Sequence, residues 1–449
     1  MGIVFLIIFT LAEIALVVLT FTKFREKTKW MQNRAVIRAA ETLLLLGIVS
    51  VPAVHMKWRF FLALGVLVIR LLIAGIVWLA RRKKAEGLRK KPRTVVSCVL
   101  SVILLALALV PSFLFTNYNG LPVTGQYGMK EVSAILVDRD REDPFENDGS
   151  SREVPAHFYY PENAAGSYPL VIFSHGAFGY YQSNFSTYAE LVSNGYVVVA
   201  LDHPHHSFFT KDTGGRLITV DQKFIEDVVG VNEEASNEFI YSVSKEWLKL
   251  RVDDENFVLD TIKAAKESRS LNDAWHTEEE AQLLDVLSHT DTGKIGLMGH
   301  SLGGASAVAL GRERKDIGAA IDIDGTMLGE ITDVRDGKCT YNTEPYPVPA
   351  LALFSETNYN EIESDSEGGY LRINDYMTAN AKDGKLVRFE KLKHMDFTDL
   401  PLISPFLGSM MGSGDIDHAE ALNTVNGLVR SWFDYYLKNE GTLAIQAKY

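Results

Sequence analysis

Long apolar runs occupy the first quarter of the chain, and short apolar runs separated by polar segments occupy the rest. The four long runs cover roughly residues 3–21, 40–54, 60–80 and 95–115. Three of them reach the ~20 residues that a helix needs to cross a bilayer, and the second is shorter. The first has no basic residues before it and no small-residue cleavage site after it, unlike a signal peptide. The pattern predicts about four transmembrane helices within residues 1–115.

The segments between the long runs differ in their basic residues. Residues 22–39 carry six Lys or Arg and residues 81–94 carry eight, whereas the turn between the second and third runs has two, Lys57 and Arg59. Basic loops stay in the cytoplasm. A four-span unit would then have both ends outside, which predicts a multi-pass cell-membrane protein with residues 116–449 on the extracytoplasmic side. If the second run does not cross, those residues lie inside instead.

Two charged residues interrupt the long runs, Glu13 in the first and Arg70 in the third. Ionised groups at this depth are costly and usually have a partner. We expect Glu13 and Arg70 to pair with each other and to be the only buried charges in this part of the chain. The alternative is that Arg70 extends to a wet groove or to the membrane surface.

Beyond about residue 130, short runs rich in β-branched and aromatic residues alternate with helical segments. The candidate strands are 132–137, 157–160, 170–174, 196–201, 294–298, Ile317–Ile323, Ala350–Phe354 and 386–391, and the candidate helices include 253–266, 304–312 and 418–438. This alternation is typical of a mostly parallel sheet with helices on both faces. Residues 116–449 are therefore predicted to form one α/β domain, with functional groups at the carboxyl ends of its strands.

Two segments interrupt this alternation. Residues 214–249 are mixed in charge, and we interpret them as a helical insertion on the surface rather than a cap over the site. Residues 139–152 are predicted to be a charged loop.

The balance of basic and acidic residues changes at about residue 115, where the long apolar runs also end. Residues 1–115 hold 17 Lys or Arg and 4 Asp or Glu, and residues 116–449 hold 28 and 53. The acidic second part repels phosphate, which argues against nucleic acid as a partner. The two cysteines, Cys98 and Cys339, provide no disulfide framework.

Residues 299–303, Gly-His-Ser-Leu-Gly, match the G-x-S-x-G pattern of a nucleophilic serine. The motif follows the candidate strand 294–298 and precedes the candidate helix 304–312, which is the setting that it requires. Glycines allow the strand and helix to pack closely, and the helix N-terminus favours developing negative charge. Ser301 is the predicted nucleophile. The alternative is a structural serine in a glycine-rich turn.

Residues 174–179, Ser-His-Gly-Ala-Phe-Gly, follow the candidate strand 170–174. A His-Gly pair at this point is the usual loop that offers a backbone N–H to an oxyanion. We predict that the amides of Ala177 and Leu302 form the oxyanion hole. His175 precedes the serine in the chain, so we interpret it as a residue that braces the loop rather than as the base.

His394 and His418 are the two histidines that follow Ser301 at a useful distance. His394 lies on a loop after the candidate strand 386–391, whereas His418 begins the last candidate helix. An imidazole at the end of a strand can take the serine proton and return it to the leaving group, so His394 is the predicted base.

The acid that orients this imidazole should also follow a strand. Asp324 follows Ile317–Ile323, and Glu356 follows Ala350–Phe354, whereas Asp322 lies within a strand. These residues by themselves leave Asp324 and Glu356 as equal alternatives.

Residues 168–176, 299–304, 320–324 and 394–399, taken together and in this order, resemble the lipoprotein-associated platelet-activating-factor acetylhydrolase family. In that family the acid follows the strand after the nucleophile helix, which implies Asp324 here. The resemblance covers about residues 125–440, implies an α/β-hydrolase fold, and implies that no metal is needed. The chain departs from the family at Phe178, which replaces a small residue, and in its apolar N-terminus.

His203, His205 and His206 are spaced like metal ligands, but they lie in a Pro-containing turn with no cysteine nearby. We therefore expect neither a metal nor another cofactor.

The expected activity is a serine ester hydrolase that uses Ser301, Asp324 and His394 on small-molecule or lipid esters, including short acyl chains of phospholipid-type esters. A peptidase or thioesterase on the same fold is the first alternative, because these enzymes share the triad. A non-catalytic membrane receptor module is the second, and the complete set of three residues argues against it. A transporter or sensor is the third, and two buried charges are too few for an ion path.

Overall fold

The computed structural model describes residues 1–163, 165–232 and 235–449, which form two compact units. The first comprises Met1–Asn119 and Pro401–Ser409, and the second comprises Gly120–Leu400 and Met410–Tyr449. The sequence placed the division after residue 115 and gave no sign that residues 401–409 join the N-terminal unit. Thr116 holds them there, because its amide donates to the carbonyl of Ile403 at 2.8 Å and its hydroxyl to that of Leu402 at 2.7 Å.

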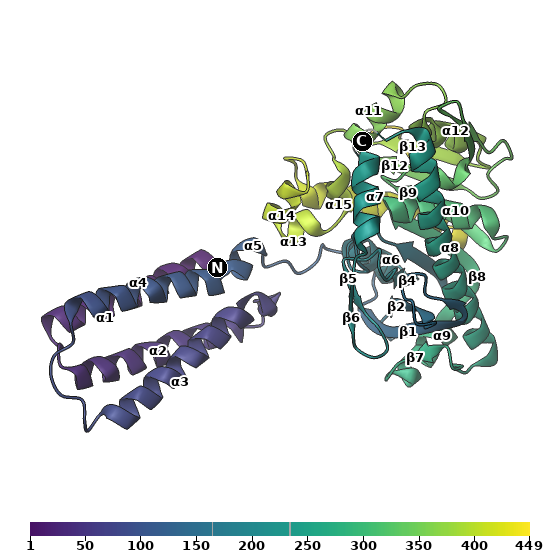
Figure 1. Ribbon diagram of the computed structural model, residues 1–449. Coiled ribbons are helices and arrows are strands. Elements are labelled where there is room, and N and C mark those ends of the chain that lie inside the picture. The colour runs from purple at the N-terminus through teal and green to yellow at the C-terminus, as the bar shows by residue number, and fades with distance from the viewer. Residues whose placement is uncertain (164, 233–234) are drawn as a thin grey trace. The chain divides into compact units, whose positions relative to one another are not determined.

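The N-terminal unit is a set of helices in which α1 lies beside α4 and α2 beside α3 (Figure 1). The helices are α1 (Gly2–Thr22), α2 (Lys27–Val49), η1 (Lys57–Phe60), α3 (Phe61–Arg81), α4 (Lys91–Ala108) and α5 (Val110–Leu114). The segment Pro401–Ser409 contains most of two further short helices, α13 (Leu400–Ile403) and α14 (Pro405–Met410). Among the described residues, three helices are long and apolar enough to cross a membrane: Gly2–Thr22, Lys57–Arg81 and Lys91–Ala108.

Helix α2 differs from the second predicted span. It begins at Lys27, far ahead of the apolar run, so Arg34 and Arg38 lie inside a helix and not in the loop where they were expected. These charges keep α2 out of the apolar set, so the described residues contain three candidate spans and not clearly the four that were predicted. The last apolar run is also broken, because Pro111 lacks the N–H that would continue the hydrogen bonding of α4 into α5.

Glu13 and Arg70 are paired, as predicted, but they belong to a larger buried cluster. Arg70 and Arg38 both bind the Glu13 carboxylate, and Arg38 Nη1 donates to Glu41 Oε2 at 2.8 Å. The expectation that Glu13 and Arg70 are the only buried charges here was therefore wrong. Two arginines against two glutamates leave the cluster neutral, which offsets part of the cost of burying each charge.

The second unit is built on a nine-stranded sheet in the order β13-β12-β9-β8-β3-β4-β2-β1-β7. The strands are β1 (Met129–Glu142), β2 (Ser151–Pro161), β3 (Tyr168–Ser174), β4 (Val197–Leu201), β7 (Trp275–His276), β8 (Thr290–His300), β9 (Ile317–Ile323), β12 (Ala350–Phe354) and β13 (Gly384–Arg388). The six strands from β13 to β4 are parallel, and β2, β1 and β7 follow as antiparallel neighbours. The continuous apolar runs read from the sequence are the buried centres of these strands.

The loop predicted for residues 139–152 is shorter in the structure, where only residues 143–150 lie between two strands. Strand β1 continues to Glu142 and β2 begins at Ser151, with Asp138 paired to Arg152. The charged residues are tolerated there because Arg141 and Arg152 both bind Asp254, at 2.6 and 2.9 Å. Two small hairpins lie outside the main sheet, β5–β6 (Phe209–Lys211 and Leu217–Thr219) and β10–β11 (Ile331–Arg335 and Lys338–Tyr341).

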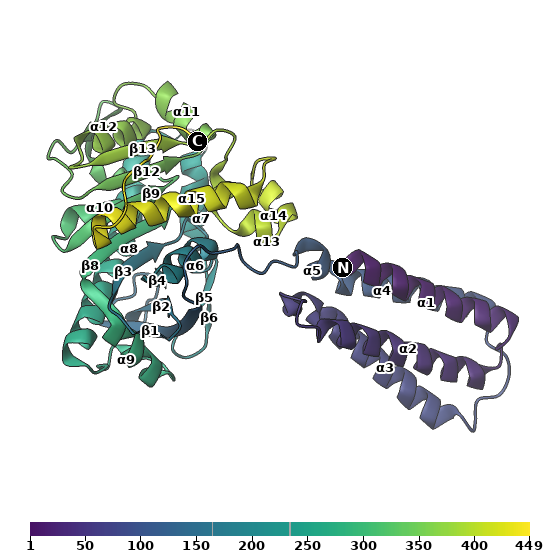
Figure 2. The same cartoon turned by 180° about the vertical axis from the view of Figure 1, so that it is seen from behind.

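Helices cover both faces of the sheet (Figure 2). One face packs against α8 (Asn237–Ser268), α9 (Glu280–His289), α10 (Leu302–Glu313), α11 (Glu356–Ser364) and α12 (Ile373–Asn380), and the other against α6 (Phe185–Ser193) and α15 (His418–Phe433). Helix α8 was expected to begin at residue 253, but it begins at Asn237 because Ser236 caps its N-terminus through its side chain. The insertion predicted over residues 214–249 is therefore not a separate element: it includes β6, α7 (Gln222–Asn232) and the first part of α8.

Candidate active site

Ser301 lies on the tight turn between β8 and α10, with φ at 56°. Its amide donates to the carbonyl of Ile323 in the neighbouring strand at 2.8 Å, which fixes the turn. The positions that follow Ser301 in the turn require glycine. A Cβ on Gly303 would come within 2.0 Å of the Ser174 carbonyl oxygen, and one on Gly304 within 1.9 Å of Asp322 Oδ1. The motif therefore encodes the close approach of β8, α10 and β3 that a strained strand–helix turn needs.

His394 and Asp324 are brought together by a hydrogen bond of 2.8 Å between Nδ1 of the imidazole and Oδ2 of the carboxylate. His394 begins the short helix η4 (His394–Phe397), and its side chain is 40% exposed while that of Asp324 is fully buried. The other carboxylate oxygen, Oδ1, accepts from the amide of Ser355 at 2.6 Å. Both oxygens are thus held in place, and Nε2 is the ring nitrogen that could take a proton from a serine.

The other carboxylates that the sequence raised bind elsewhere. Glu356 accepts from the Lys391 amide at 3.2 Å and lies 3.4 Å from the Arg388 guanidinium. Asp322 accepts from the Gly325 amide at 2.9 Å, and burial raises its pKa well above the usual range. The sequence alone could not show which carboxylate binds the base, because all of them lie at or near strand ends on the same edge of the sheet.

Two histidines near His394 have other partners. His300 donates from Nε2 to the carbonyl of His394 at 3.1 Å, and the two rings lie 4.5 Å apart. Burial, followed by the proximity of His394, lowers the pKa of His300 well below its usual value, so it stays neutral. His418 lies 3.2 Å from Asp396 at the start of α15.

The loop that carries Ala177 lies against the serine turn. A Cβ on Gly176 would sit 3.1 Å from Ser301 Cβ. The amide of Phe178 donates to the His206 carbonyl at 3.1 Å, and that of Gly179 donates to the Gly176 carbonyl at 3.0 Å. Within the described part of the chain, the amide of Ala177 has no such partner. Leu302, the second predicted donor, is the first residue of α10.

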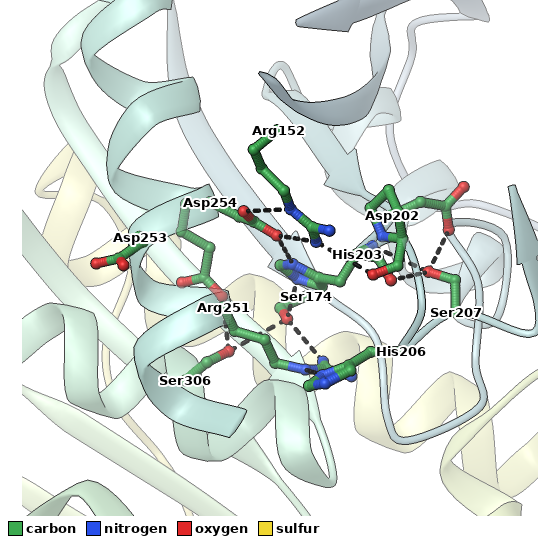
Figure 3. A network of polar contacts seen from close by, with 12 residues as sticks. Arg152, Ser174, Asp202, His203, His206, Ser207, Arg251, Asp253, Asp254 and Ser306 are labelled. Carbon is green, nitrogen blue, oxygen red and sulfur yellow. Dashed lines mark hydrogen bonds and ion pairs between the residues drawn. The ribbon is translucent and has the colours of Figure 1, made fainter. Parts of the chain in front are cut away.

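A buried network behind this loop fixes its backbone (Figure 3). Arg251 of α8 binds the His175 carbonyl and donates to Ser174 Oγ at 3.2 Å. His203 connects Ser174 Oγ, at 2.9 Å from Nε2, to Asp254 Oδ2, at 3.0 Å from Nδ1. Because the guanidinium and the imidazole contact the loop's own atoms, they hold it in place. His175 is itself buried and binds Ser207 Oγ at 2.7 Å.

Sequence reasoning missed Arg251 and Glu255, which are fully buried on α8. A signal was present, because both fall in register with Leu248, Val258 and Ile262 along the apolar stripe of that helix. Charged residues at core positions of a helix normally have buried partners. Glu255 accepts from Ser306 Oγ at 2.6 Å, and burial raises its pKa to about 7.

Burial dominates the electrostatics of this region. It lowers the pKa of His203 to about 4 and those of His175 and His206 well below their usual value, with the Arg251 charge acting in the same direction. Burial also lowers the pKa of Arg251 to about 9. For Asp254, burial alone would raise the pKa, but the charge of Arg152 and the hydrogen bonds from His203 and Arg152 outweigh it and lower the pKa.

The three histidines that are spaced like metal ligands in the sequence have different neighbours in the structure and do not face a common point. His203 faces Asp254, the ring of His205 stacks on Phe145 at 4.3 Å, and that of His206 stacks on Phe224 at 3.8 Å. Residues 1–163, 165–232 and 235–449 contain no group of three His, Cys, Asp or Glu side chains arranged to hold a metal ion.

The buried imidazoles predict that the second unit loses stability as the pH falls from about 6.5 to about 5. Unfolded histidine binds a proton below about 6.5, whereas His175, His203, His206 and His300 stay neutral in the fold. Glu255 and Asp322 act in the opposite sense, because their raised pKa values keep protons in the fold that the unfolded chain releases. The net uptake of about two protons on unfolding corresponds to at most roughly 2.7 kcal/mol per pH unit. Denaturant unfolding at about pH 6.5 and about pH 5 measures this loss of stability. A denaturation midpoint that is equal or higher at the lower pH contradicts the prediction.

Apolar side chains surround the two predicted oxyanion donors. Phe224 of α7 and Trp247 of α8 pack in one cluster with Leu302, and Ala177 and Phe178 lie against it. Residues 214–249 were expected on the surface, away from the site, and this expectation was wrong. They cover the serine turn because Phe224 and Trp247 bury their rings against it, 5.4 Å apart and edge to face.

Comparisons with known proteins identify the family of this chain. The profile of the family described as platelet-activating factor acetylhydrolase, isoform II, matches residues 145–440. A platelet-activating factor acetylhydrolase of Cavia porcellus is 23% identical over 297 residues, 64% of this chain and 62% of that protein. A probable 1-alkyl-2-acetylglycerophosphocholine esterase of Arthroderma benhamiae is 25% identical over 287 residues, 61% of this chain and 62% of that protein. The chain thus spans about three fifths of the length of these relatives.

A solved structure shows the fold. The ferulic acid esterase of Streptomyces cinnamoneus superimposes with a TM-score of 0.52 and 21% sequence identity, over 72% of this chain and 94% of that one. Together with the mostly parallel sheet covered on both faces, this confirms the predicted α/β-hydrolase fold of the second unit.

Proposed function

Because this chain belongs to the platelet-activating factor acetylhydrolase, isoform II, family, we propose that it is a serine ester hydrolase anchored in a membrane. The observation that carries the proposal is the hydrogen bond between His394 and Asp324, on the sheet edge where the strained turn presents Ser301. All three residues follow strands of one parallel sheet, where α/β proteins place their sites. The buried acid, the half-exposed imidazole and the serine turn match the roles that acyl transfer needs.

The proposed reaction proceeds in two halves. Ser301 Oγ attacks the ester carbonyl carbon while Nε2 of His394 takes its proton, and the amides of Ala177 and Leu302 bind the resulting oxyanion. The bond to the alcohol oxygen then breaks, and His394 returns the proton to the departing alcohol. Water repeats the attack on the acyl-serine and releases the acid. Asp324 holds the tautomer of His394 that carries its proton on Nδ1 and stabilises the imidazolium.

The substrate class that we propose is an ester with a short acyl group, including phospholipid-type esters. The rings of Phe178, Phe224 and Trp247 pack together beside Leu302, which makes the surface next to the serine turn apolar and suited to an acyl group. The names of the relatives point the same way, since both describe enzymes that act on acetyl esters of glycerophospholipids or of platelet-activating factor.

Hydrolysis of p-nitrophenyl acetate and palmitate by the full-length protein in detergent tests this substrate class. We expect kcat/KM for the acetate to exceed that for the palmitate by at least about 100-fold, because even one methylene that a pocket cannot accept is worth about tenfold or more. A 2-acetyl and a 2-palmitoyl phosphatidylcholine should follow the same order. Equal rates for the two chain lengths would contradict the short-acyl proposal, and faster cleavage of a thioester or peptide would favour the other reactions of this fold.

We further propose that the first unit crosses the membrane four times and leaves the second unit outside. Three helices are apolar enough to cross, and α2, with 23 residues, is long enough. Its Arg38 and Glu41 pair with each other, which lowers the cost of placing them in a bilayer. Protease added to intact cells should remove an epitope tag placed after Tyr449. A tag that stays protected until lysis contradicts this orientation.

A further inference from the structure

Four arginines line a groove in the N-terminal unit. The groove has a volume of about 520 Å³ and is lined by Arg34 of α2, Arg70 of α3, Arg89 and Arg93 at the start of α4, and a row of residues along α4. Its lining contains no carboxylate. Arg70 is neutralised by the Glu13 and Glu41 cluster behind it. In the part of the chain that the structure describes, Arg34, Arg89 and Arg93 have no acidic residue within 4.0 Å, so the groove carries net positive charge.

The arginines are held in place, which distinguishes the groove from a mobile basic surface. Trp30 lies between two of them, with the Arg89 guanidinium 3.9 Å and the Arg34 guanidinium 5.4 Å from its ring. The amide of Arg89 donates to the Arg25 carbonyl at 2.7 Å, so the loop before α4 is fixed to the loop before α2. Nε of Arg34 and Nε of Arg89 are buried without a hydrogen-bond partner. The fold therefore maintains unpaired cations at a defined position.

The far end of the groove is apolar and lies along a helix. Val96, Leu100 and Leu104 are spaced four residues apart on α4, so they form one stripe, and each is more than 40% exposed. The basic end lies where α3 ends and α4 begins, next to the basic residues 81–84, and the apolar end extends toward the middle of α4. Positive charge at one end and an apolar stripe of about two helical turns at the other match a phosphate headgroup and part of its acyl chain.

We propose that this groove binds one anionic glycerophospholipid, with its phosphate against Arg34, Arg89 and Arg93 and an acyl chain along Val96, Leu100 and Leu104. Guanidinium groups bind phosphate oxygens through paired, charge-assisted hydrogen bonds. The basic residues on this side of the unit would place the headgroup in the cytoplasmic leaflet. The lipid would then be a structural ligand of the membrane unit, separate from the ester that the second unit hydrolyses. The inference rests on the membrane insertion proposed above.

Native mass spectrometry of the full-length protein in a neutral detergent tests the groove, with dioleoyl phosphatidylglycerol and dioleoyl phosphatidylcholine as probes. We expect the anionic lipid to bind at least about tenfold more tightly, because each Lys or Arg near an anionic lipid contributes about fivefold. R34Q/R93Q should weaken its binding by about 30-fold, since two such contributions are lost. The matched control is K315Q/K338Q, which removes the same charge from exposed positions of the second unit and should change the affinity by less than about twofold.

Three results would overturn the proposal. They are equal binding of the two lipids, unchanged phosphatidylglycerol binding by R34Q/R93Q, and displacement of the lipid by millimolar glycerol 3-phosphate or inorganic phosphate, which would mean a site for free phosphate. The charge-preserving R34K/R93K should bind phosphatidylglycerol more weakly than the unchanged protein but more tightly than R34Q/R93Q, because lysine keeps the charge and loses the paired hydrogen bonds. Alkaline extraction of membranes and esterase activity, measured on the same preparations, report failure of the membrane anchor and of the hydrolase separately.

Discussion

Replacing Ser301 with alanine is expected to lower kcat for p-nitrophenyl acetate by roughly 10⁴- to 10⁶-fold, because no other group can form the acyl intermediate. The substitution removes one oxygen and leaves the amide of Ser301 bound to the Ile323 carbonyl, so the turn at φ 56° should persist. The KM should change little, because the hydroxyl contributes to the transition state more than to ground-state binding. Steady-state kinetics on purified full-length protein measure both constants.

The matched control for this change is Ser431→Ala, which removes a hydroxyl that donates within α15, to the Gly427 carbonyl at 2.7 Å. Its kcat should stay within about twofold of the unchanged protein, as for most substitutions away from a site. A Ser301→Ala protein that keeps more than a tenth of the activity would mean that another residue is the nucleophile.

Replacing Asp324 with asparagine is expected to lower kcat by about 10⁴-fold. With the amide oxygen accepting from Ser355, the amide NH2 faces Nδ1 of His394 and donates to it, which holds the imidazole in the wrong tautomer. The substitution also removes the charge that stabilises the imidazolium when Ser301 is deprotonated. The fold should tolerate the change, since asparagine is isosteric and its oxygen can still accept from the Ser355 amide. Circular dichroism and kcat on the same sample separate loss of activity from loss of structure.

Glu356→Gln is the comparison that decides between the two acids that the sequence left equal. Glu356 binds Arg388 and the amide of Lys391, both on the strand side of the loop that leads to His394. Its loss should therefore change kcat by no more than about threefold, as expected for a partly exposed ion pair. If Glu356→Gln were the more damaging of the two, the acid would be Glu356 and Asp324 would be a structural residue of the loop.

The sequence was sufficient to predict the central strands of the second unit because these strands are buried on both faces. Such strands are continuous apolar runs, and Ile317–Ile323 and Ala350–Phe354 were predicted with the bounds that the structure has. The serine turn was predictable for a different reason. The close approach of the backbones of β8, α10 and β3 permits only glycine at positions 299 and 303, which leaves a recognisable motif.

What the sequence could not indicate was the pairing of charges far apart in the chain. In the sequence, Arg251 and Asp254 look like charged residues on an exposed helix. Their partners are about 50 to 100 residues away along the chain. Arg38 read as a loop residue because it follows other basic residues, whereas it is buried against Glu13 and Glu41. Residues 214–249 were interpreted as a surface insertion because their charges are mixed. Only the fold brings Phe224 and Trp247 together over the serine turn.

The position of the nucleophile is the central claim, and fluorophosphonate labelling of the full-length protein tests it most directly. The reagent forms a covalent adduct with a serine that an adjacent base activates. Peptide mapping by mass spectrometry should find one adduct per chain, on the peptide that contains Ser301, and Asp324→Asn should slow its formation along with catalysis. No adduct on the folded protein, or an adduct on another residue while Ser301 stays unmodified, would contradict the account.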